Sequence, residues 1–208
     1  MTRIVVCGTG TDVGKTVFSA ALVAALDGFY WKPIQAGIAD GTDRQRVSSL
    51  SALPAERMLP EAYCLDTPCS PHRSAELQGI RIDLDRLSPP ALPGPLVIEG
   101  AGGVLVPITR SILYADLFAR WQIPVVIVAQ TLLGTINHSL LTIEALRARH
   151  VPIIGIAFVG DPQPDSEGTI AAIGTVRRLG RLPRLPELNA QALLDAFRAN
   201  FDLADFRE

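Results

Sequence analysis

The sequence predicts a doubly wound α/β fold built on a mostly parallel sheet. Short apolar runs alternate with longer helical patterns along the 208 residues, which is the order that strands and helices take in such sheets. The apolar runs are nearly continuous, as expected for strands buried on both faces. No long linker or internal repeat divides the chain, so we expect a single domain over residues 1–208.

The expected elements follow in order from these runs. A β-branched strand at 3–7 is closed by Gly8, and a helix follows over 14–26. The Pro-rich segment 88–95 cannot continue a helix and is predicted to be a loop. Further strands are predicted at 29–34, 96–99, 124–129 and 153–159, and helices at about 43–53, 114–122, 135–149, 166–179 and 189–201.

Composition excludes several classes of protein. Hydrophobic residues make up 48% of the chain and charged residues 19%, and no apolar run reaches the roughly 20 residues that span a bilayer. The first residues lead directly into a strand without a signal-peptide core, so we expect a cytoplasmic protein without membrane contact. A net charge of −2 offers no footprint for nucleic acid. Cys7, Cys64 and Cys69 lack metal-ligand spacing and are expected to be reduced.

A glycine-rich loop lies between the first strand and the first helix. Residues 8–16 read GTGTDVGKT, and Gly14, Lys15 and Thr16 stand at the strand-to-helix junction that a phosphate-binding loop requires. Backbone N–H groups and the helix N-terminus would hold a phosphate together with Lys15, and Thr16 would face Mg²⁺. Gly8 is one position too early for the strict G-x-x-x-x-G-K-[ST] pattern, so the loop is a variant.

Lysine is rare in this chain. Only Lys15 and Lys32 occur, against 17 arginines. Lys32 ends the second predicted strand, and ligands of open parallel sheets bind at the carboxyl ends of the strands. We therefore expect both ammonium groups at one phosphate-like site, because lysine is a compact point charge and arginine a wide fork. Codon usage biased against lysine could instead explain why only two remain, and Lys32 could be a surface lysine at a strand end.

Two carboxylates are candidate metal ligands. Asp43 begins a predicted helix and Glu99 ends the third predicted strand. Together with Thr16 they would supply the hard oxygen ligands that Mg²⁺ prefers. Asp43 could instead be a plain helix N-cap, whereas a buried ionised Glu99 must be paired or metal-bound.

The helix predicted to start near 135 follows a strand and could bind a second anion, such as a substrate carboxylate. Thr135 could alternatively be only the N-cap. His138 in the first turn is expected to be a packing or solvent residue rather than a general base.

These motifs resemble one family closely, the ATP-dependent dethiobiotin synthetases of biotin biosynthesis. Besides the phosphate loop, the resemblance covers Lys32-Pro33, Asp43, Ser70-Pro71-His72, Glu99-Gly100-Ala101-Gly102-Gly103, Ala115-Asp116 and Leu133-Gly134-Thr135-Ile136-Asn137-His138. It implies a P-loop NTPase-like fold and a homodimer that converts 7,8-diaminononanoate, CO₂ and ATP to dethiobiotin, ADP and phosphate with Mg²⁺.

The resemblance also implies roles for individual residues. Lys15, Lys32 and Thr11 would be catalytic, and Thr16, Asp43 and Glu99 would hold the metal. The substrate would contact Thr11, Asp12 and Lys32, with its carboxylate received across the dimer interface at Gly134, Thr135, Ile136 and Asn137. The nucleotide would contact Asp12, Val13, Gly14, Lys15, Thr16, Val17, Asp43, Glu99, Gly100, Ala101, Gly102, Pro183, Arg184 and Leu185.

Three departures from the family pattern bear on specificity. Asp12 stands where a glutamate is known, and Ala36 where a serine or threonine hydroxyl often contacts substrate. The asparagine that reads adenine is replaced by Val159 or Gly160. Without that amide, discrimination among nucleotides should weaken, so we expect other nucleoside triphosphates to serve nearly as well as ATP.

A reading from a different class is a P-loop switch ATPase of the partitioning type, without biosynthetic activity. Such proteins usually place a second lysine inside the loop, and residues 9–11 contain none. A related amidoligase is disfavoured because 208 residues leave no room for a glutaminase domain.

Overall fold

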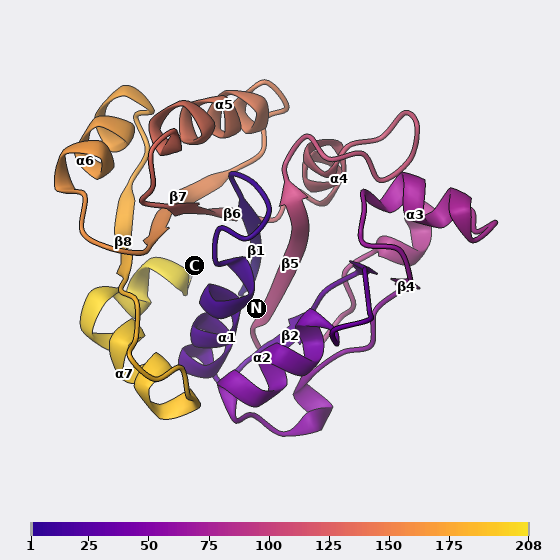
Figure 1. Ribbon diagram of the computed structural model, residues 1–208, viewed down its shortest axis with the longest axis horizontal. Helices are drawn as coiled ribbons and strands as arrows, with labels where there is room; N and C mark the ends of the chain where they lie inside the picture. Colours follow the sequence, from indigo (N-terminus) through magenta and orange to yellow (C-terminus); the bar gives the residue numbers. More distant parts are fainter. Residues whose placement is uncertain (1, 208) are drawn as a thin grey trace.

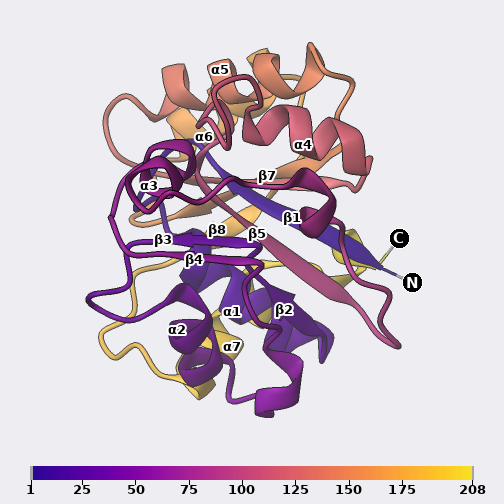
Figure 2. The ribbon, with the colours of Figure 1, turned by 90° about the vertical axis from the view of Figure 1, so that its right-hand side faces the viewer.

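Two layers of helices cover the opposite faces of a parallel sheet (Figures 1 and 2). The computed structural model describes residues 2–207. The six-stranded sheet has the order β2-β5-β1-β6-β7-β8, and every pairing in it is parallel. Its strands are β1 (Arg3–Gly8), β2 (Phe29–Trp31), β5 (Leu96–Gly103), β6 (Val125–Gln130), β7 (Ile153–Val159) and β8 (Arg178–Leu182). The predicted fold class is confirmed.

The helices divide between the two faces as a doubly wound sheet requires. Figure 2 shows α1 (Lys15–Leu26), α2 (Asp43–Ser51) and α7 (Ala190–Asn200) on one side of the sheet. On the other side lie α4 (Tyr114–Trp121), α5 (Thr135–Arg147) and α6 (Pro164–Ile173). No helix among residues 2–207 has the length and apolar character needed to cross a bilayer.

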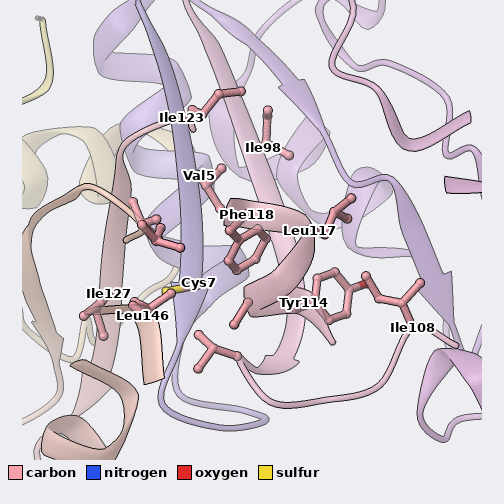
Figure 3. Packing of buried hydrophobic residues seen from close by; sticks show 14 of the residues in the cluster. Val5, Cys7, Ile98, Ile108, Tyr114, Leu117, Phe118, Ile123, Ile127 and Leu146 are labelled. Carbon is pink, nitrogen blue, oxygen red and sulfur yellow. The ribbon is translucent and has the colours of Figure 1, made fainter. Parts of the chain in front are cut away.

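Alternation along β1 explains how one strand serves two cores. Val5 and Cys7 belong to the cluster under α4 and α5, part of which is drawn in Figure 3. Ile4 and Val6 point the other way and pack under α1 and α7. Successive side chains of a strand alternate between faces, so a strand covered on both sides is apolar at every position.

A small parallel sheet lies beside the main one. It pairs β3 (Ile34–Ala36) with β4 (Tyr63–Leu65), and α3 (Pro71–Leu77) follows it in the chain. Short 3₁₀ helices occur at Ala55–Arg57, Leu84–Leu87 and Leu203–Phe206. The Pro-rich segment 88–95 is a loop before β5, as predicted.

Two sequence predictions are wrong. The strand expected at 29–34 is two strands in different sheets, because Pro33 has no N–H to donate and the chain leaves the main sheet at Lys32. The helix expected at 166–179 ends at Ile173, and its last residues instead enter β8. That strand lies at the sheet edge and contains Arg178 and Arg181, so it has no apolar run by which to be recognised.

The order of the strands fixes where a ligand can bind. The connection from β1 leads outward to β2, whereas β6 lies on the other side of β1. The order therefore reverses at β1, and such switch points open a crevice at the carboxyl ends of the strands. The glycine-rich loop follows β1 directly.

Candidate functional site

The loop after β1 is shaped by two residues with left-handed backbone conformations. Asp12 has φ 57° and Gly14 has φ 96°. A Cβ at Gly14 would lie 2.9 Å from Val159 Cγ1, so the loop and the end of β7 meet there without room for a side chain. The ammonium of Lys15 donates to Gly10 O at 2.7 Å, which folds this side chain back over the loop. The predicted phosphate-binding conformation is consistent with this geometry.

Lys32 lies at the point where the chain leaves the main sheet. Its ammonium is paired with Asp43, lies 3.2 Å from Glu99 Oε1 and lies 3.4 Å from Gly100 O. The side chain of Lys32 is 5% exposed and that of Glu99 is 0% exposed. The prediction that Lys32 belongs to the site is consistent with this placement, and the alternative of a surface lysine is wrong.

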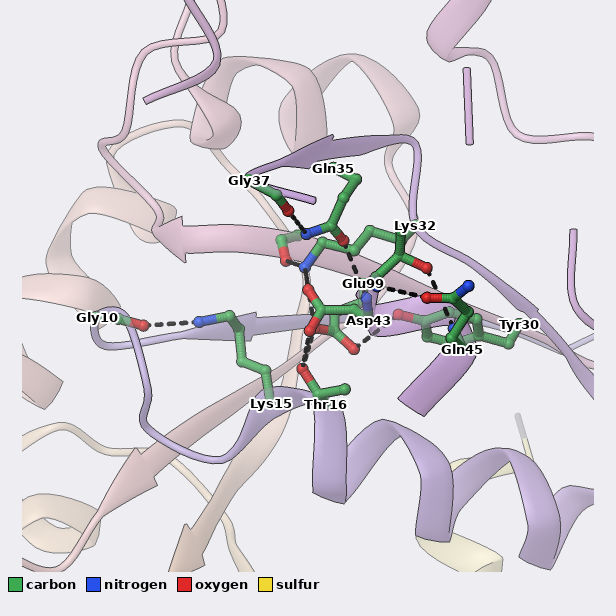
Figure 4. Close-up of polar contacts among 12 residues, drawn as sticks. Gly10, Lys15, Thr16, Tyr30, Lys32, Gln35, Gly37, Asp43, Gln45 and Glu99 are labelled. Carbon is green, nitrogen blue, oxygen red and sulfur yellow. Dashed lines mark hydrogen bonds and ion pairs between the residues drawn. The ribbon is translucent and has the colours of Figure 1, made fainter. Parts of the chain in front are cut away.

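The three candidate metal ligands converge on one spot (Figure 4). The Thr16 hydroxyl lies 3.0 Å from Asp43 Oδ1 and 2.9 Å from Glu99 Oε1. One hydroxyl has a single proton and can donate to only one of these oxygens at a time. Two carboxylates and a hydroxyl are a donor set that fits Mg²⁺, with phosphate oxygens and water completing its octahedron. Over residues 2–207 there is no group of three or more His, Cys, Asp or Glu side chains that could hold a metal by themselves.

The Asp43 carboxylate is available as a metal ligand because Thr42, not Asp43, caps the helix. The side chain of Thr42 accepts from the Gln45 N–H, and Gln45 reciprocates to the Thr42 N–H. The alternative in which Asp43 is the N-cap is therefore wrong. Asp43 occupies the first helical position, where a negative charge is also favoured by the helix dipole.

Two residues that were not predicted from the sequence, Tyr30 and Gln35, bond to Glu99 and Asp43. The Tyr30 hydroxyl donates to Glu99 Oε2 at 3.1 Å from the neighbouring strand. The side-chain carbonyl of Gln35 accepts from the Asp43 N–H at 3.1 Å. Neither contact has a local signal in the sequence, because Tyr30 meets Glu99 only through the pairing of β2 with β5, and Gln35 of β3 meets Asp43 only where α2 begins.

The charges of the cluster support one another. Burial alone would lower the pKa of Lys32, but Glu99 and Asp43 raise it above its usual range. Burial would raise the pKa of Asp43, yet Lys32 lowers it overall. Burial also lowers the pKa of Lys15, more than Glu99 raises it. Burial, reinforced by Glu99, keeps the pKa of Tyr30 well above its usual value, so this hydroxyl remains a donor.

A cavity of about 780 Å³ lies over these groups. Its walls include Gln35 and Ala36 from β3 and Cys69, Ser70 and Pro71 from the segment before and at the start of α3. Eleven of the predicted site residues also line it, namely Thr11, Asp12, Gly14, Lys15, Thr16, Val17, Lys32, Asp43, Glu99, Ala101 and Gly102. A second cavity of about 820 Å³ lies between α3 and the segment 108–112, and neither lysine lines it.

Other predicted residues lie outside this cavity. Val13 is buried in the core under α1, and Gly100 contributes only its carbonyl to Lys32. Pro183, Arg184 and Leu185 follow β8, with Arg184 near Asp161 on the surface. Gly134, Thr135, Ile136 and Asn137 open α5. The structure does not bring these last two groups into the cavity of the same chain.

The start of α5 excludes one of its two predicted roles, the one in which Thr135 is only the N-cap. Gly134, with φ 92°, occupies the N-cap position, so the reading of Thr135 as the N-cap is wrong. The Thr135 hydroxyl is buried without a hydrogen-bond partner within the described chain. His138 is exposed, in agreement with its reading as a solvent residue.

A family model and curated relatives match nearly the whole chain. A family of AAA domains matches residues 2–192. The chain is 62% identical to an ATP-dependent dethiobiotin synthetase of Rhodopseudomonas palustris, over 98% of this chain and 95% of the relative. It is 63% identical to one of Novosphingobium aromaticivorans, over 99% of this chain and all of the relative.

Solved structures with this fold come from a different group of proteins. The cell-division ATPase MinD of Pyrococcus furiosus matches 95% of this chain and 98% of its own, with a TM-score of 0.53 and 11% identity. A ParA family ATPase of Chlorobium tepidum matches with a TM-score of 0.51, also at 11% identity, over 96% and 98% of the two chains. At this identity the likeness concerns the fold alone.

Proposed function

The chain belongs to the family of ATP-dependent dethiobiotin synthetases, and from this premise we propose that it makes dethiobiotin from 7,8-diaminononanoate, CO₂ and ATP with Mg²⁺. It is a ligase that forms carbon–nitrogen bonds at the expense of ATP. The observation that supports the detailed proposal best is the convergence of Lys32 with Thr16, Asp43 and Glu99 beside the phosphate loop.

The phosphate loop and Lys15 would bind the triphosphate. Backbone N–H groups of residues 10–16 and the N-terminus of α1 supply fixed positive dipoles, and Lys15 adds a mobile charge. Thr16, Asp43 and Glu99 would hold Mg²⁺, which supplies charge neutralisation for the phosphate oxygens when bound. Tyr30 would keep the Glu99 carboxylate oriented, and Gln35 would hold the backbone of Asp43.

Lys32 would act on the carboxylated substrate. One amine of the diamine attacks CO₂ and loses a proton to give a carbamate, whose oxygen attacks the γ-phosphorus while ADP leaves. The second amine then attacks the carbamate carbon, closes the five-membered ring and expels phosphate. Each step develops negative charge on oxygen, and a buried ammonium stabilises such charge far better than water does. Thr11, exposed on the cavity wall, would donate a hydrogen bond to the carbamate.

A second copy of the chain would complete the substrate site. Leu132 and Leu133, just before α5, and Leu141, in the middle of this helix, are 51%, 106% and 54% exposed. A cluster of exposed leucines is a typical protein-interaction surface. In a homodimer through this surface, the α5 start with Gly134, Thr135, Ile136 and Asn137 would receive the carboxylate of substrate bound to the other subunit.

The test of the proposed function is product formation. Purified protein is incubated with ATP, Mg²⁺, the diamine and ¹³C-bicarbonate, and dethiobiotin is followed by mass spectrometry alongside ADP release. One labelled carbon per ADP is expected, and ADP release should depend on the diamine. ADP release that is independent of the diamine but stimulated by DNA or a protein partner would instead support the switch ATPase.

The dimer is tested separately with Leu133→Arg, which places a charge at the exposed surface. We expect light scattering to show monomers, and synthesis to be lost because the substrate site needs the second copy. ATP binding should be retained, because the phosphate loop lies elsewhere in the chain. A variant that remains dimeric and active would refute this interface. Ile173→Arg, a charge at another exposed apolar residue, is the matched control.

A further inference from the structure

The four carboxylate oxygens of Asp43 and Glu99 are all engaged, and Lys32 takes part in two of these engagements. Asp43 meets Thr16 with one oxygen and Lys32 with the other. Glu99 Oε1 is shared by Thr16 at 2.9 Å and Lys32 at 3.2 Å, while Oε2 accepts from Tyr30. An ammonium and a divalent cation therefore compete for the same oxygens.

The geometry indicates which group has to move. Glu99 is fixed by Tyr30 through Oε2, and Asp43 is fixed through its backbone by Gln35. Lys32 has no such anchor at its charged end, since its remaining partner is Gly100 O at 3.4 Å, and its flexible stem faces the cavity. Like charges in contact within a buried site repel strongly. Lys32 therefore cannot stay paired with both carboxylates once a divalent cation is bound to them.

We propose that Lys32 is the resident counter-ion of Asp43 and Glu99 and that a divalent cation displaces it from them toward the anion bound in the cavity. Lys32 then has two positions, one on the carboxylates and one on the substrate. This inference rests on the proposed function, because it takes Thr16, Asp43 and Glu99 as the metal ligands. It adds that metal binding delivers the charge of Lys32 to the substrate.

Two consequences follow from this exchange. Before the metal binds, the charge of Lys32 is neutralised by the carboxylates and is poorly available to a substrate anion. Coupling between two ligands is reciprocal, so an anion that holds Lys32 away from the carboxylates should tighten metal binding in turn. Lys15 is the natural comparison, since it lines the same cavity but forms no ion pair with either carboxylate within the described chain.

The scarcity of lysine makes the exchange directly observable. Protein labelled with ¹³C,¹⁵N-lysine has only two labelled side chains, Lys15 and Lys32, and Lys32→Met assigns them. The protein is first bound to ADP in the presence of a chelator, and excess Mg²⁺ is then added. We expect the Lys32 signal to shift on addition of Mg²⁺. A Lys32 signal that stays fixed while the Lys15 signal moves overturns the exchange, and no response of either lysine to nucleotide contradicts the proposed nucleotide site itself.

A second measurement uses Mn²⁺ alone, without nucleotide, followed by electron paramagnetic resonance. Removing the competing ammonium with Lys32→Met should tighten Mn²⁺ binding at least about tenfold, within the usual range of coupling between sites. The control Lys15→Met should change it less than about threefold, because Lys15 does not contact the carboxylates. Equal effects of the two variants overturn the proposal. If Lys32→Met does not fold, the lysine spectra of the unmodified protein, with the two signals assigned by Lys15→Met, decide.

Discussion

Replacing Lys32 by arginine keeps the charge and changes only its shape. The ammonium fits among three acceptors, the Asp43 carboxylate, Glu99 Oε1 and Gly100 O, with 5% of the side chain exposed. A guanidinium presents five N–H donors in a rigid plane, so two donors lack partners and the positive charge is displaced. A displacement of about 1 Å at a reacting centre costs about a hundredfold in rate, or about 2.7 kcal/mol in the barrier.

We therefore expect Lys32→Arg to lower kcat about a hundredfold and to leave the Kd for ATP within about threefold, because within residues 2–207 Lys32 forms no hydrogen bond or ion pair with the phosphate loop. Lys15→Arg should both lower kcat and raise the Kd for ATP, since Lys15 belongs to the phosphate loop. Rapid-quench measurement of dethiobiotin formation gives kcat, and calorimetry with a non-hydrolysable ATP analogue gives Kd. A Lys32→Arg enzyme with kcat within about tenfold of the unmodified protein would refute the argument.

Three further predictions concern stability and specificity. Gly14→Ala should lower the free energy of unfolding by about 2–4 kcal/mol, because φ is 96° and the new Cβ would lie 2.9 Å from Val159. Urea unfolding measures this cost, and in the control Gly10→Ala it should be about 1 kcal/mol or less. Equal costs for the two variants would contradict the prediction. Burial would raise the pKa of Asp116, but Arg149 and the Leu113 N–H lower it overall. Asp116→Asn should therefore cost about 1 kcal/mol near neutral pH, and the difference should vanish as the pH falls below about 3.9 and through the lower folded pKa; a cost independent of pH would contradict the ion pair. Because Val159 and Gly160 offer no side-chain amide, kcat/KM for CTP or GTP should lie within about tenfold of that for ATP, and an ATP preference above about a hundredfold would contradict this expectation.

The sheet was predictable where burial left a mark on composition. Strands covered on both faces form nearly continuous apolar runs, and β1, β5, β6 and β7 were found by that property. β8 escaped detection because it lies at the edge and contains Arg178 and Arg181. Its arginines serve a tertiary purpose, since both contact the buried carboxylate of Glu167 on α6.

The break after β2 was unpredicted for a similar reason. Residues 29–34 form one continuous apolar run apart from Lys32 and Pro33. That the chain crosses to a second sheet at Pro33 depends on β4, a strand of three residues whose partner is β3. A pairing between segments so short has no periodic signal of its own.

The sequence by itself determined the phosphate loop, the alternation of strands and helices, and the identity of the charged residues at the strand ends. These properties are local: glycines at a strand-to-helix junction, apolar runs and a strand-end lysine act within a few residues of one another. Only the tertiary structure decided that Lys32 shares the carboxylate oxygens of Asp43 and Glu99 with Thr16, and that Tyr30 holds the remaining oxygen. The reason is physical, because β2 lies beside β5 rather than beside β1, and that neighbour relation alone brings residues 67 apart in sequence into contact.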